Sequence, residues 1–459
     1  MSIEKLYEIY QKHPEVTTDS RRCPTGSLFF ALRGETFDGN RFANKALEAG
    51  AAVAVVDDAT IIPQGDNRYF LVPDTLEALQ QLAVCHRQHF QGTVIQVTGT
   101  NGKTTTKELM AAVLSRKYTV LYTQGNLNNH IGVPLTLLRL KPGFHEMAII
   151  ETGANHPGEI AALTKMVDPD YGLITNVGRA HLEGFGSFEG VKSTKGELYD
   201  YIGMKERACI FFNVSNKDLV QMAHERHLDD PDYKWSYGKA IAKCSLYGHL
   251  DASGKAHIVG EVAACNPMTR VHWRNIQGVD YEVQTRLIGD YNLDNILAAI
   301  AVGTHFGVEP DNINAALSDY QPSLGRSEYR KTQYNELIVD AYNANPSSMK
   351  AALTNFRAIQ HPHKMVILGD MRELGKDSDN AHSQILETLI DSDLEEAWLV
   401  GECFNKATQA LDVPDGFKLQ TFPDVEAVKN KIQEARPVNA CILIKGSNST
   451  CLHQLPDLL

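Results

Sequence analysis

A short glycine-bounded turn between an apolar segment and a helical pattern constrains this chain more than any other stretch. Residues 93–97 read TVIQV, as expected for a buried strand, and GTNGKTT follows at residues 99–105. In residues 107–114 apolar side chains recur four positions apart, which is typical of one helix face. A strand, a glycine turn and a helix together let backbone N–H groups and a helix N-terminus hold phosphate. The turn therefore predicts an α/β domain that binds a phosphorylated ligand.

Two residues of the turn indicate the kind of ligand. Lys103 is placed to reach the terminal phosphates of a nucleoside triphosphate, and Thr104 can offer its hydroxyl to Mg²⁺. The strict eight-residue P-loop pattern is not met, because Val97 stands where its first glycine belongs. The segment is a shortened variant, Gly-x-x-Gly-Lys-Thr, and a plain strand-to-helix turn is the alternative interpretation.

Composition sets the class of protein. A length of 459 residues suggests about three domains, and 43% hydrophobic residues is ordinary for a globular chain. The longest apolar run, residues 49–56, is too short to span a membrane, and the N-terminus lacks the apolar core of a signal peptide. The 8 cysteines show no CxxC spacing, so we expect reduced thiols in a cytoplasm. A net charge of −12 argues against a nucleic-acid partner.

The first two of three blocks are predicted to be α/β domains of different size. Residues 1–85 combine an apolar segment at 51–56 with a helical pattern at 75–87, which indicates a small domain. Residues 86–320 contain the turn and further short apolar segments separated by helical stretches, at 119–122, 147–150 and 171–175. Short apolar strands that alternate with helices are typical of a mostly parallel sheet with both faces covered.

This central sheet is predicted to carry an antiparallel extension, and a second doubly wound unit follows it. Between residues 233 and 287 the pattern changes, and from Val279 to Leu287 every second residue is apolar or β-branched. Residues 321–326 read as a linker. Beyond it, apolar segments alternate with helices in a Rossmann-like C-terminal domain, at 337–339, 365–368, 397–400 and 441–444. No GxGxxG follows its first strand, so a dinucleotide site is not predicted.

Polar side chains stand where strands of the central block end. Glu151 follows the strand at 148–150, and Asn176 and His181 follow the strand at 173–175. Ligands of open α/β sheets collect at the carboxyl ends of the strands, so these groups are predicted to approach the phosphate turn. A carboxylate, an imidazole and a threonine hydroxyl make a mixed Mg²⁺ shell, although imidazole is an unusual Mg²⁺ ligand. His181 alone would be read as an ordinary surface histidine; convergence on one edge favours function.

Two further features remain open from the residues alone. The polar segment GNLNNHIGVP at residues 125–134 either faces the same site or is an ordinary connection. Lys195 lies in a helical pattern, where the default interpretation is a solvated lysine.

Seven motifs of the chain belong together. They are GTNGKTT (99–105), GNLNNHIGVP (125–134), GANHPGEI (153–160), AHLEGFGS (180–187), YNLDN (291–295), DAYNANP (340–346) and GDMRELG (369–375). In these motifs the chain resembles the Mur ligases. The first motif is shared with folylpolyglutamate synthases, whereas GANHPGEI, YNANP and GDM are typical of the branch that adds D-alanyl-D-alanine. The matches continue to the KGS at residues 445–447, so nearly the whole chain is covered.

The resemblance implies ATP and two Mg²⁺ ions as cofactors, with roles for matching residues. The nucleotide contacts would be Gly99, Thr100, Asn101, Gly102, Lys103, Thr104, Thr105, Asn295, Arg326 and Asp340. The metal ligands would be Thr104, Glu151, His181 and Lys195, the last carrying a carbamate. A neutral lysine that captures CO₂ turns a cation into an oxygen ligand, which requires a lowered amine pKa. The residues expected to take part in catalysis are Lys103, Lys195 and His181.

The resemblance also implies the substrates. The N-terminal block would bind UDP-MurNAc-tripeptide, the central block ATP, and the C-terminal block D-Ala-D-Ala together with part of the nucleotide. Substrate contacts are expected from Ser20, Arg21, Asp38, Gly39, Asn128, Asn343 and Asn345. An amide bond would form through an acyl phosphate, and we expect a monomer.

The chain departs from the family pattern near its C-terminus. Asn448 stands where the family often carries arginine after Lys-Gly-Ser, and residues 450–453 lack the usual Met-Glu pair. Two alternatives remain: a related ligase that adds another amino acid, or glutamate to a folate, and a non-catalytic nucleotide-binding regulator.

Overall fold

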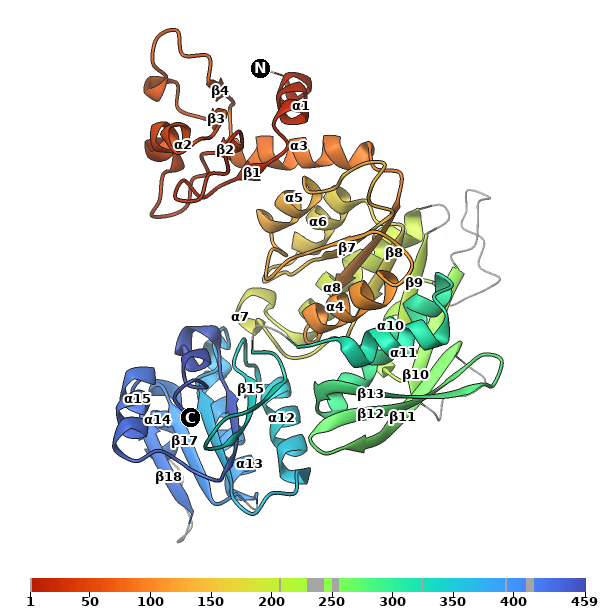
Figure 1. The fold of residues 1–459 in the computed structure, drawn as a ribbon, viewed down its shortest axis with the longest axis vertical. Coiled ribbons are helices and arrows are strands. Elements are labelled where there is room, and N and C mark those ends of the chain that lie inside the picture. The colour runs from red at the N-terminus through yellow and green to blue at the C-terminus, as the bar shows by residue number, and fades with distance from the viewer. Residues whose placement is uncertain are drawn as a thin grey trace.

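The structure, a computed structural model, describes residues 2–205, 208–228, 243–249, 256–322, 325–392, 394–409 and 417–459. Three α/β domains follow one another along an elongated molecule (Figure 1). Each has its own sheet, of four, nine and six strands in chain order. The predicted fold class is confirmed, including the small first domain and the doubly wound third domain. Among the described helices, none is long and apolar enough to cross a membrane.

The N-terminal domain is a parallel sheet of order β1-β2-β3-β4 with three helices. Its elements are α1 (Ile3–Lys12), β1 (Val16–Thr17), β2 (Leu28–Phe30), α2 (Ala43–Glu48), β3 (Val53–Val56), β4 (Tyr69–Leu71) and α3 (Thr75–Gln88). Helix α3 packs on helices of the central domain, where Leu79 and Leu82 share a core with Val133 and Leu163. The first domain is therefore attached to the second through a common apolar interface.

The central domain has the strand order β13-β12-β11-β10-β9-β8-β5-β7-β6. Its strands are β5 (Thr93–Thr98), β6 (Val120–Tyr122), β7 (Met147–Glu151), β8 (Tyr171–Ile174), β9 (Cys209–Asn213), β10 (Lys243–His249), β11 (Ile258–Cys265), β12 (Met268–Asn275) and β13 (Asp280–Ile288). Its helices are α4 (Lys103–Leu114), α5 (Gly132–Leu137), α6 (Glu159–Val167), α7 (Leu182–Phe185), α8 (Phe188–Met204), α9 (Lys217–His224), α10 (Leu293–His305) and α11 (Pro310–Asp319). Neighbouring strands from β11 to β6 run parallel.

The antiparallel extension predicted for this sheet is confirmed. Strands β11, β12 and β13 pair antiparallel at one edge. In β13 Val283, Thr285 and Leu287 are buried while Gln284 and Arg286 between them are exposed, which is the alternation seen in the sequence. The parts of the predicted extension at residues 233–242 and 250–255 lie outside the described residues.

The C-terminal domain has the strand order β14-β15-β19-β16-β17-β18, and β14 alone among these described strands is antiparallel to its neighbour. Its elements are β14 (Glu328–Lys331), β15 (Glu336–Asp340), α12 (Pro346–Ala358), β16 (Lys364–Gly369), α13 (Ser378–Ile390), β17 (Glu396–Val400), α14 (Glu402–Gln409), β18 (Lys418–Phe422), α15 (Val425–Glu434) and β19 (Cys441–Lys445). Successive residues of β15 alternate between two cores, with Leu337 in one and Ile338 in the other. Both faces of the sheet are thus covered. Residues 323–324 of the predicted linker lie outside the described residues.

Candidate active site

A cavity of about 1220 Å³ lies where the central and C-terminal domains meet. The carboxyl ends of strands from both sheets line it, with Glu151 at the end of β7 and Asp340 and Lys445 at the ends of β15 and β19. Lys103 and His181 line the same cavity. The groups expected to converge from the central sheet edge therefore share one space with groups from the third domain.

The turn between β5 and α4 is held open by two glycines. Gly99 and Gly102 have positive φ angles of 141° and 75°. A Cβ atom at Gly102 would lie 2.4 Å from Asn295 Oδ1, so no larger residue fits there without a shift. No side chain caps the start of α4. The first backbone N–H groups of this helix are thus left for a ligand, as phosphate binding requires.

Lys103 is folded back onto this turn. Its Nζ donates hydrogen bonds of 2.9 Å to the carbonyl oxygens of Gly99 and Thr100. Burial lowers the pKa of Lys103, nearby Arg326 acts in the same direction, and Glu151 opposes both. The ammonium therefore lies at the phosphate turn, where its hydrogen bonds go to neutral carbonyl oxygens. An anionic ligand can replace these oxygens.

Glu151 combines a satisfied and an unsatisfied carboxylate oxygen. The side chain is 1% exposed. Its Oε1 accepts hydrogen bonds from Thr104 Oγ1 at 3.1 Å and Asn128 Nδ2 at 2.7 Å. Its buried Oε2 accepts no hydrogen bond from the described residues. A carboxylate and a hydroxyl lie side by side here, and one carboxylate oxygen accepts no hydrogen bond from the described residues. These groups fit the oxygen ligands that Mg²⁺ prefers.

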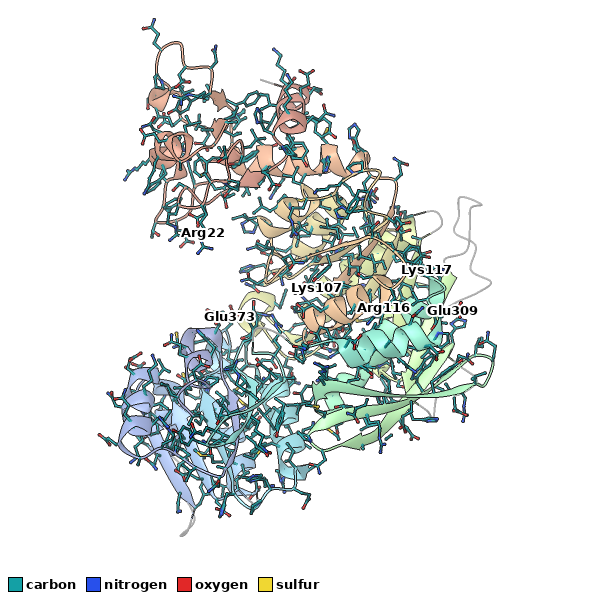
Figure 2. All side chains as sticks on the ribbon, viewed as in Figure 1. Arg22, Lys107, Arg116, Lys117, Glu309 and Glu373 are labelled. Carbon is teal, nitrogen blue, oxygen red and sulfur yellow. The ribbon has the colours of Figure 1, made fainter. Side chains whose placement is uncertain are left out.

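Lys107 is a functional candidate that the sequence reasoning missed. Its fully buried Nζ lies 3.7 Å from Glu151 Oε2 and donates a 2.7 Å hydrogen bond to the carbonyl oxygen of Thr123. It stands on α4 in the interior of the central domain (Figure 2). The signal was present, because Lys107 follows Lys103 by one helical turn and so shares its face.

His181 pairs with a residue of the third domain. Its Nδ1 forms an ion pair with Glu373 Oε2, and this contact lowers the pKa of the Glu373 carboxyl. Glu373 lies at the edge of the C-terminal domain that faces α7 (Figure 2). Glu373 belongs to the GDMRELG motif, but its role could not be predicted from the sequence. A contact between two domains leaves no local sequence pattern.

Lys195 is not the solvated helix lysine that its position alone suggests. It lies on α8 with 2% exposure and does not belong to the described lining of the cavity. Burial lowers its pKa to about 7, assisted by Lys103, while Glu159 and Glu197 act in the opposite direction. The default interpretation was wrong because the packing of α8 against the sheet cannot be read from its own sequence.

The residues expected at the nucleotide line the cavity from two domains. Asn295 lies under Gly102, accepts a 3.0 Å hydrogen bond from Thr106 Oγ1 and donates one of 2.9 Å to Asn292 Oδ1. Arg326 and Tyr342 line the same cavity, and the Arg326 guanidinium stacks on the Tyr342 ring, 3.5 Å from its centroid.

Asp340 was expected at the site from the sequence, but its partner Lys445 was not. It pairs with Lys445, which is buried at the end of β19. Lys445 could have been found by the rule that selected Glu151, because it is a charged residue that ends an apolar strand.

Asn101 connects the phosphate turn to the third domain. Its Oδ1 accepts a 2.8 Å hydrogen bond from Asn345 Nδ2, and its Nδ2 donates one of 3.1 Å to Ser347 Oγ. Asn343 lines the same cavity. The cavity lining also includes Thr100, Thr104, Thr105, Asn128 and Asn448.

The expected substrate residues of the first domain lie elsewhere. Ser20, Arg21, Asp38 and Gly39 do not belong to the described lining of this cavity. Arg21 pairs with Asp19, and Asp38 caps a 3₁₀ helix by accepting a 3.0 Å hydrogen bond from the Asn40 N–H. Gln80 of α3 reaches the cavity from this domain. The first domain thus borders the site without bringing these four residues into it.

The glycine turn, the buried carboxylate and the junction of two doubly wound sheets define a multidomain α/β protein of the nucleotide-binding class. Three family models match the chain in order. They are the Mur ligase family catalytic domain at residues 14–87, the Mur ligase middle domain at 97–303 and the Mur ligase glutamate ligase domain at 325–448. The chain belongs to the Mur ligase family.

Characterised relatives share most of the chain. A UDP-N-acetylmuramoyl-tripeptide--D-alanyl-D-alanine ligase of Bacillus subtilis is 36% identical over 80% of this chain and 76% of its own. The ligase of the same name from Escherichia coli is 34% identical over 96% of this chain and 92% of its own.

Solved structures agree over the whole length. A crystal structure of MurF from Acinetobacter baumannii has a TM-score of 0.83 at 30% identity and covers 100% of this chain and 98% of its own. MurF ligase from Thermotoga maritima, solved in complex with ADP, has a TM-score of 0.78 at 25% identity, with 97% of each chain covered. A folylpolyglutamate synthase of Mycobacterium tuberculosis shares the fold alone, with a TM-score of 0.62 at 14% identity over 83% of this chain and 94% of its own.

Proposed function

We propose that the chain is an ATP-dependent amide ligase that joins D-alanyl-D-alanine to UDP-N-acetylmuramoyl-tripeptide in peptidoglycan precursor synthesis. Full-length relatives at 34% identity carry this activity in their names. The observation that carries the proposal is the shared cavity, in which Lys103, Glu151 and His181 of the central domain face Arg326 and Asp340 of the third. Such a cavity can hold a nucleotide from one domain while an acceptor arrives from the other.

The reaction brings anions together, so charge neutralisation is its main demand. The tripeptide carboxylate attacks the γ-phosphorus of ATP, and the bond to the bridging oxygen breaks to give an acyl phosphate and ADP. The dipeptide amine then attacks the acyl carbon, and the tetrahedral intermediate expels phosphate. Lys103 at the turn and Arg326 of the third domain both line the cavity, and each is a cation that can stabilise the developing charge.

Thr104, Glu151 and His181 are the residues that would hold Mg²⁺. Glu151 Oε2 accepts no hydrogen bond from the described residues, and the Thr104 hydroxyl contacts Oε1 beside it, which supports this assignment. Two Mg²⁺ ions, when bound, would offset the charge of the phosphate groups.

Lys195 is proposed to carry a carbamate. Its pKa of about 7 makes a neutral amine accessible. The neutral nitrogen bonds to the carbon of CO₂ and loses a proton, so that a cation becomes an anionic oxygen ligand. The buried position of Lys195 on α8, near Lys103, supports this change of charge.

Each domain receives a separate task in this proposal. Residues 1–85 bind the UDP-substrate through Ser20, Arg21, Asp38 and Gly39, and residues 86–320 hold ATP. Residues 321–459 receive the dipeptide and contact the nucleotide, with Asn343 and Asn345 joined by Asn128 from the central domain. Closure between domains aligns the reacting groups. We further propose that the protein acts as a monomer in the cytoplasm.

An acceptor assay tests the proposal. ATP-dependent phosphate release is measured with UDP-MurNAc-tripeptide containing either diaminopimelate or lysine, and with D-Ala-D-Ala or single amino acids as acceptor. We expect release that depends on D-Ala-D-Ala. Release with a single amino acid instead would indicate a related ligase, and no ADP formation with any acceptor would favour a nucleotide-binding regulator.

A further inference from the structure

The ion pair between His181 and Glu373 joins two residues that both have unusual backbone conformations. His181 has φ 52° and Glu373 has φ 62°, in the left-handed region that residues other than glycine rarely adopt. Such conformations cost free energy and persist where the surrounding structure holds them in place. Two of them meeting across a domain boundary indicates a built contact rather than a chance one.

The turn that carries Glu373 is fixed by a buried network. His382 Nε2 accepts a 3.0 Å hydrogen bond from the Met371 N–H, and Ser447 Oγ accepts one of 3.0 Å from the Arg372 N–H. The buried Asp370 carboxylate accepts two bonds of 3.0 Å from the N-terminus of α14. Residues 370–372 are therefore pinned on three sides immediately before Glu373.

The same network excludes a different role for this cluster. Asp370, His382 and Cys403 lie close enough to suggest a metal site. His382 has no ring nitrogen free for a metal, because its Nε2 accepts from the Met371 N–H and its Nδ1 is 2.7 Å from the Ser378 carbonyl oxygen. The cluster therefore serves to position the turn.

We propose that Glu373 is a positioning residue for His181, holding the imidazole so that its Nε2 carries the lone pair available to a metal ion. A carboxylate beside Nδ1 keeps the proton on that nitrogen, which is how outer carboxylates orient metal-binding histidines. The inference rests on the proposed function, in which His181 is a metal ligand.

The origin of Glu373 in the third domain adds a second consequence. His181 belongs to the central domain, so the carboxylate reaches it only when the two domains are docked. The contacts of Asn101 with Asn345 and Ser347 form in the same docked arrangement. The metal site is thereby completed by the domain that also receives the acceptor.

The experiment compares metal binding in the wild type and in variants of His181 and Glu373. Mn²⁺ binding is followed by electron paramagnetic resonance in the presence of a non-hydrolysable ATP analogue, and the site of interest is the one weakened by His181→Ala. For Glu373→Gln we expect a Mn²⁺ affinity at this site lower by about tenfold or more, with kcat reduced by a similar factor. Glu373→Asp, which keeps the charge, should recover part of both.

A matched control is available in the same domain. His363 and Glu395 form an exposed His–Glu pair, 3.4 Å from Nδ1 to Oε2, away from the cavity. Glu395→Gln should leave Mn²⁺ affinity and kcat unchanged. If Glu373 acted only on folding, its variant would lose thermal stability and nucleotide affinity as well, and combining it with His181→Ala would lower Mn²⁺ affinity further.

The possible failures are distinguishable. A wild-type affinity for Mn²⁺ in Glu373→Gln, with the wild-type enzyme active as a ligase, would overturn the role of Glu373 alone. Unchanged Mn²⁺ binding in His181→Ala would overturn it too. A wild-type protein without ligase activity would contradict the proposed function instead.

Discussion

Two strand-to-helix junctions line the cavity and use opposite chemistry. At the first, β5 leads into α4 through Gly102, which offers no side-chain cap. At the second, β15 leads into α12 through Asn345, whose Oδ1 accepts a 2.9 Å hydrogen bond from the Ser348 N–H in a capping box with Pro346 at the start of the helix. One helix leaves its first N–H groups to a ligand, and the other satisfies them itself.

This difference explains why the starts of α4 and α12, which follow strands of similar sheets, suit different kinds of contact. Free N–H groups at a helix start attract phosphate, so the first junction suits the nucleotide. A capped start presents side chains instead, and here Asn345 also donates to Asn101 of the first junction. The second junction therefore satisfies its own N–H groups and contacts the first junction through the Asn345 side chain.

The largest expected effect comes from removing the ammonium of the open junction. Lys103→Ala should lower ATP-dependent phosphate release by on the order of 10³-fold, because the site loses a cation aimed at developing charge. Lys406→Ala, which removes an exposed lysine of α14, serves as control. Near-normal turnover of Lys103→Ala would remove Lys103 from the mechanism.

Closing the open junction should have the next largest effect. Gly102→Ala places a Cβ 2.4 Å from Asn295 Oδ1 at a φ of 75°, so the turn must distort. We expect ADP affinity to fall roughly ten- to hundredfold in calorimetry. Gly65→Ala is the control, since Gly65 has a φ of 82° with nothing within 4 Å of the added Cβ. Equal ADP affinity in both variants would show that the glycine turn does not bind the nucleotide.

Lys195, buried on α8 and close enough to Lys103 for its pKa to be affected, makes the free energy of unfolding depend on pH. In the unfolded chain a lysine keeps its proton to about pH 10.4, whereas in the folded protein it titrates near 7. Between these values the unfolded state binds more protons, so the free energy of unfolding contributed by Lys195 rises with pH. Below pH 7 the penalty for the buried charge is complete.

The variant Lys195→Met removes this penalty. We expect it to be more stable than the wild type in urea unfolding at pH 6, with the difference shrinking as the pH rises toward 10. Its ligase activity should be lost at every pH. A stability difference independent of pH would show that Lys195 is solvated or already modified.

The smallest effect is expected at the capped junction. Asn345→Ala should lower the free energy of unfolding by about 1 kcal/mol, as for other lost helix caps, and change ADP affinity by less than about threefold. Asp424→Ala, at the cap of α15 far from the cavity, should cost a similar amount. A loss of ADP affinity above tenfold for Asn345→Ala alone would contradict the claim that only the first junction binds the nucleotide.

The sequence predicted the elements and the open junction well because both depend on local patterns. Strand ends selected Glu151 and His181, and helical and glycine spacing located the turn. Lys107 and Lys195 were missed or misread because their burial depends on which strands and helices pack against them.

Contacts between domains were the second feature that could not be predicted from the sequence. The pairing of His181 with Glu373 arises from docking of the central and third domains, which no spacing within one block encodes. The separation of Ser20 and Arg21 from the cavity reflects domain arrangement in the same way.

The most direct test is a crystal structure with Mg²⁺ and a non-hydrolysable ATP analogue. We expect the triphosphate on the N–H groups of residues 102–105 near Lys103, with Mg²⁺ at about 2.1 Å from oxygens of Thr104 or Glu151. A triphosphate bound at the start of α12, with the turn of Gly102 empty, would contradict the account.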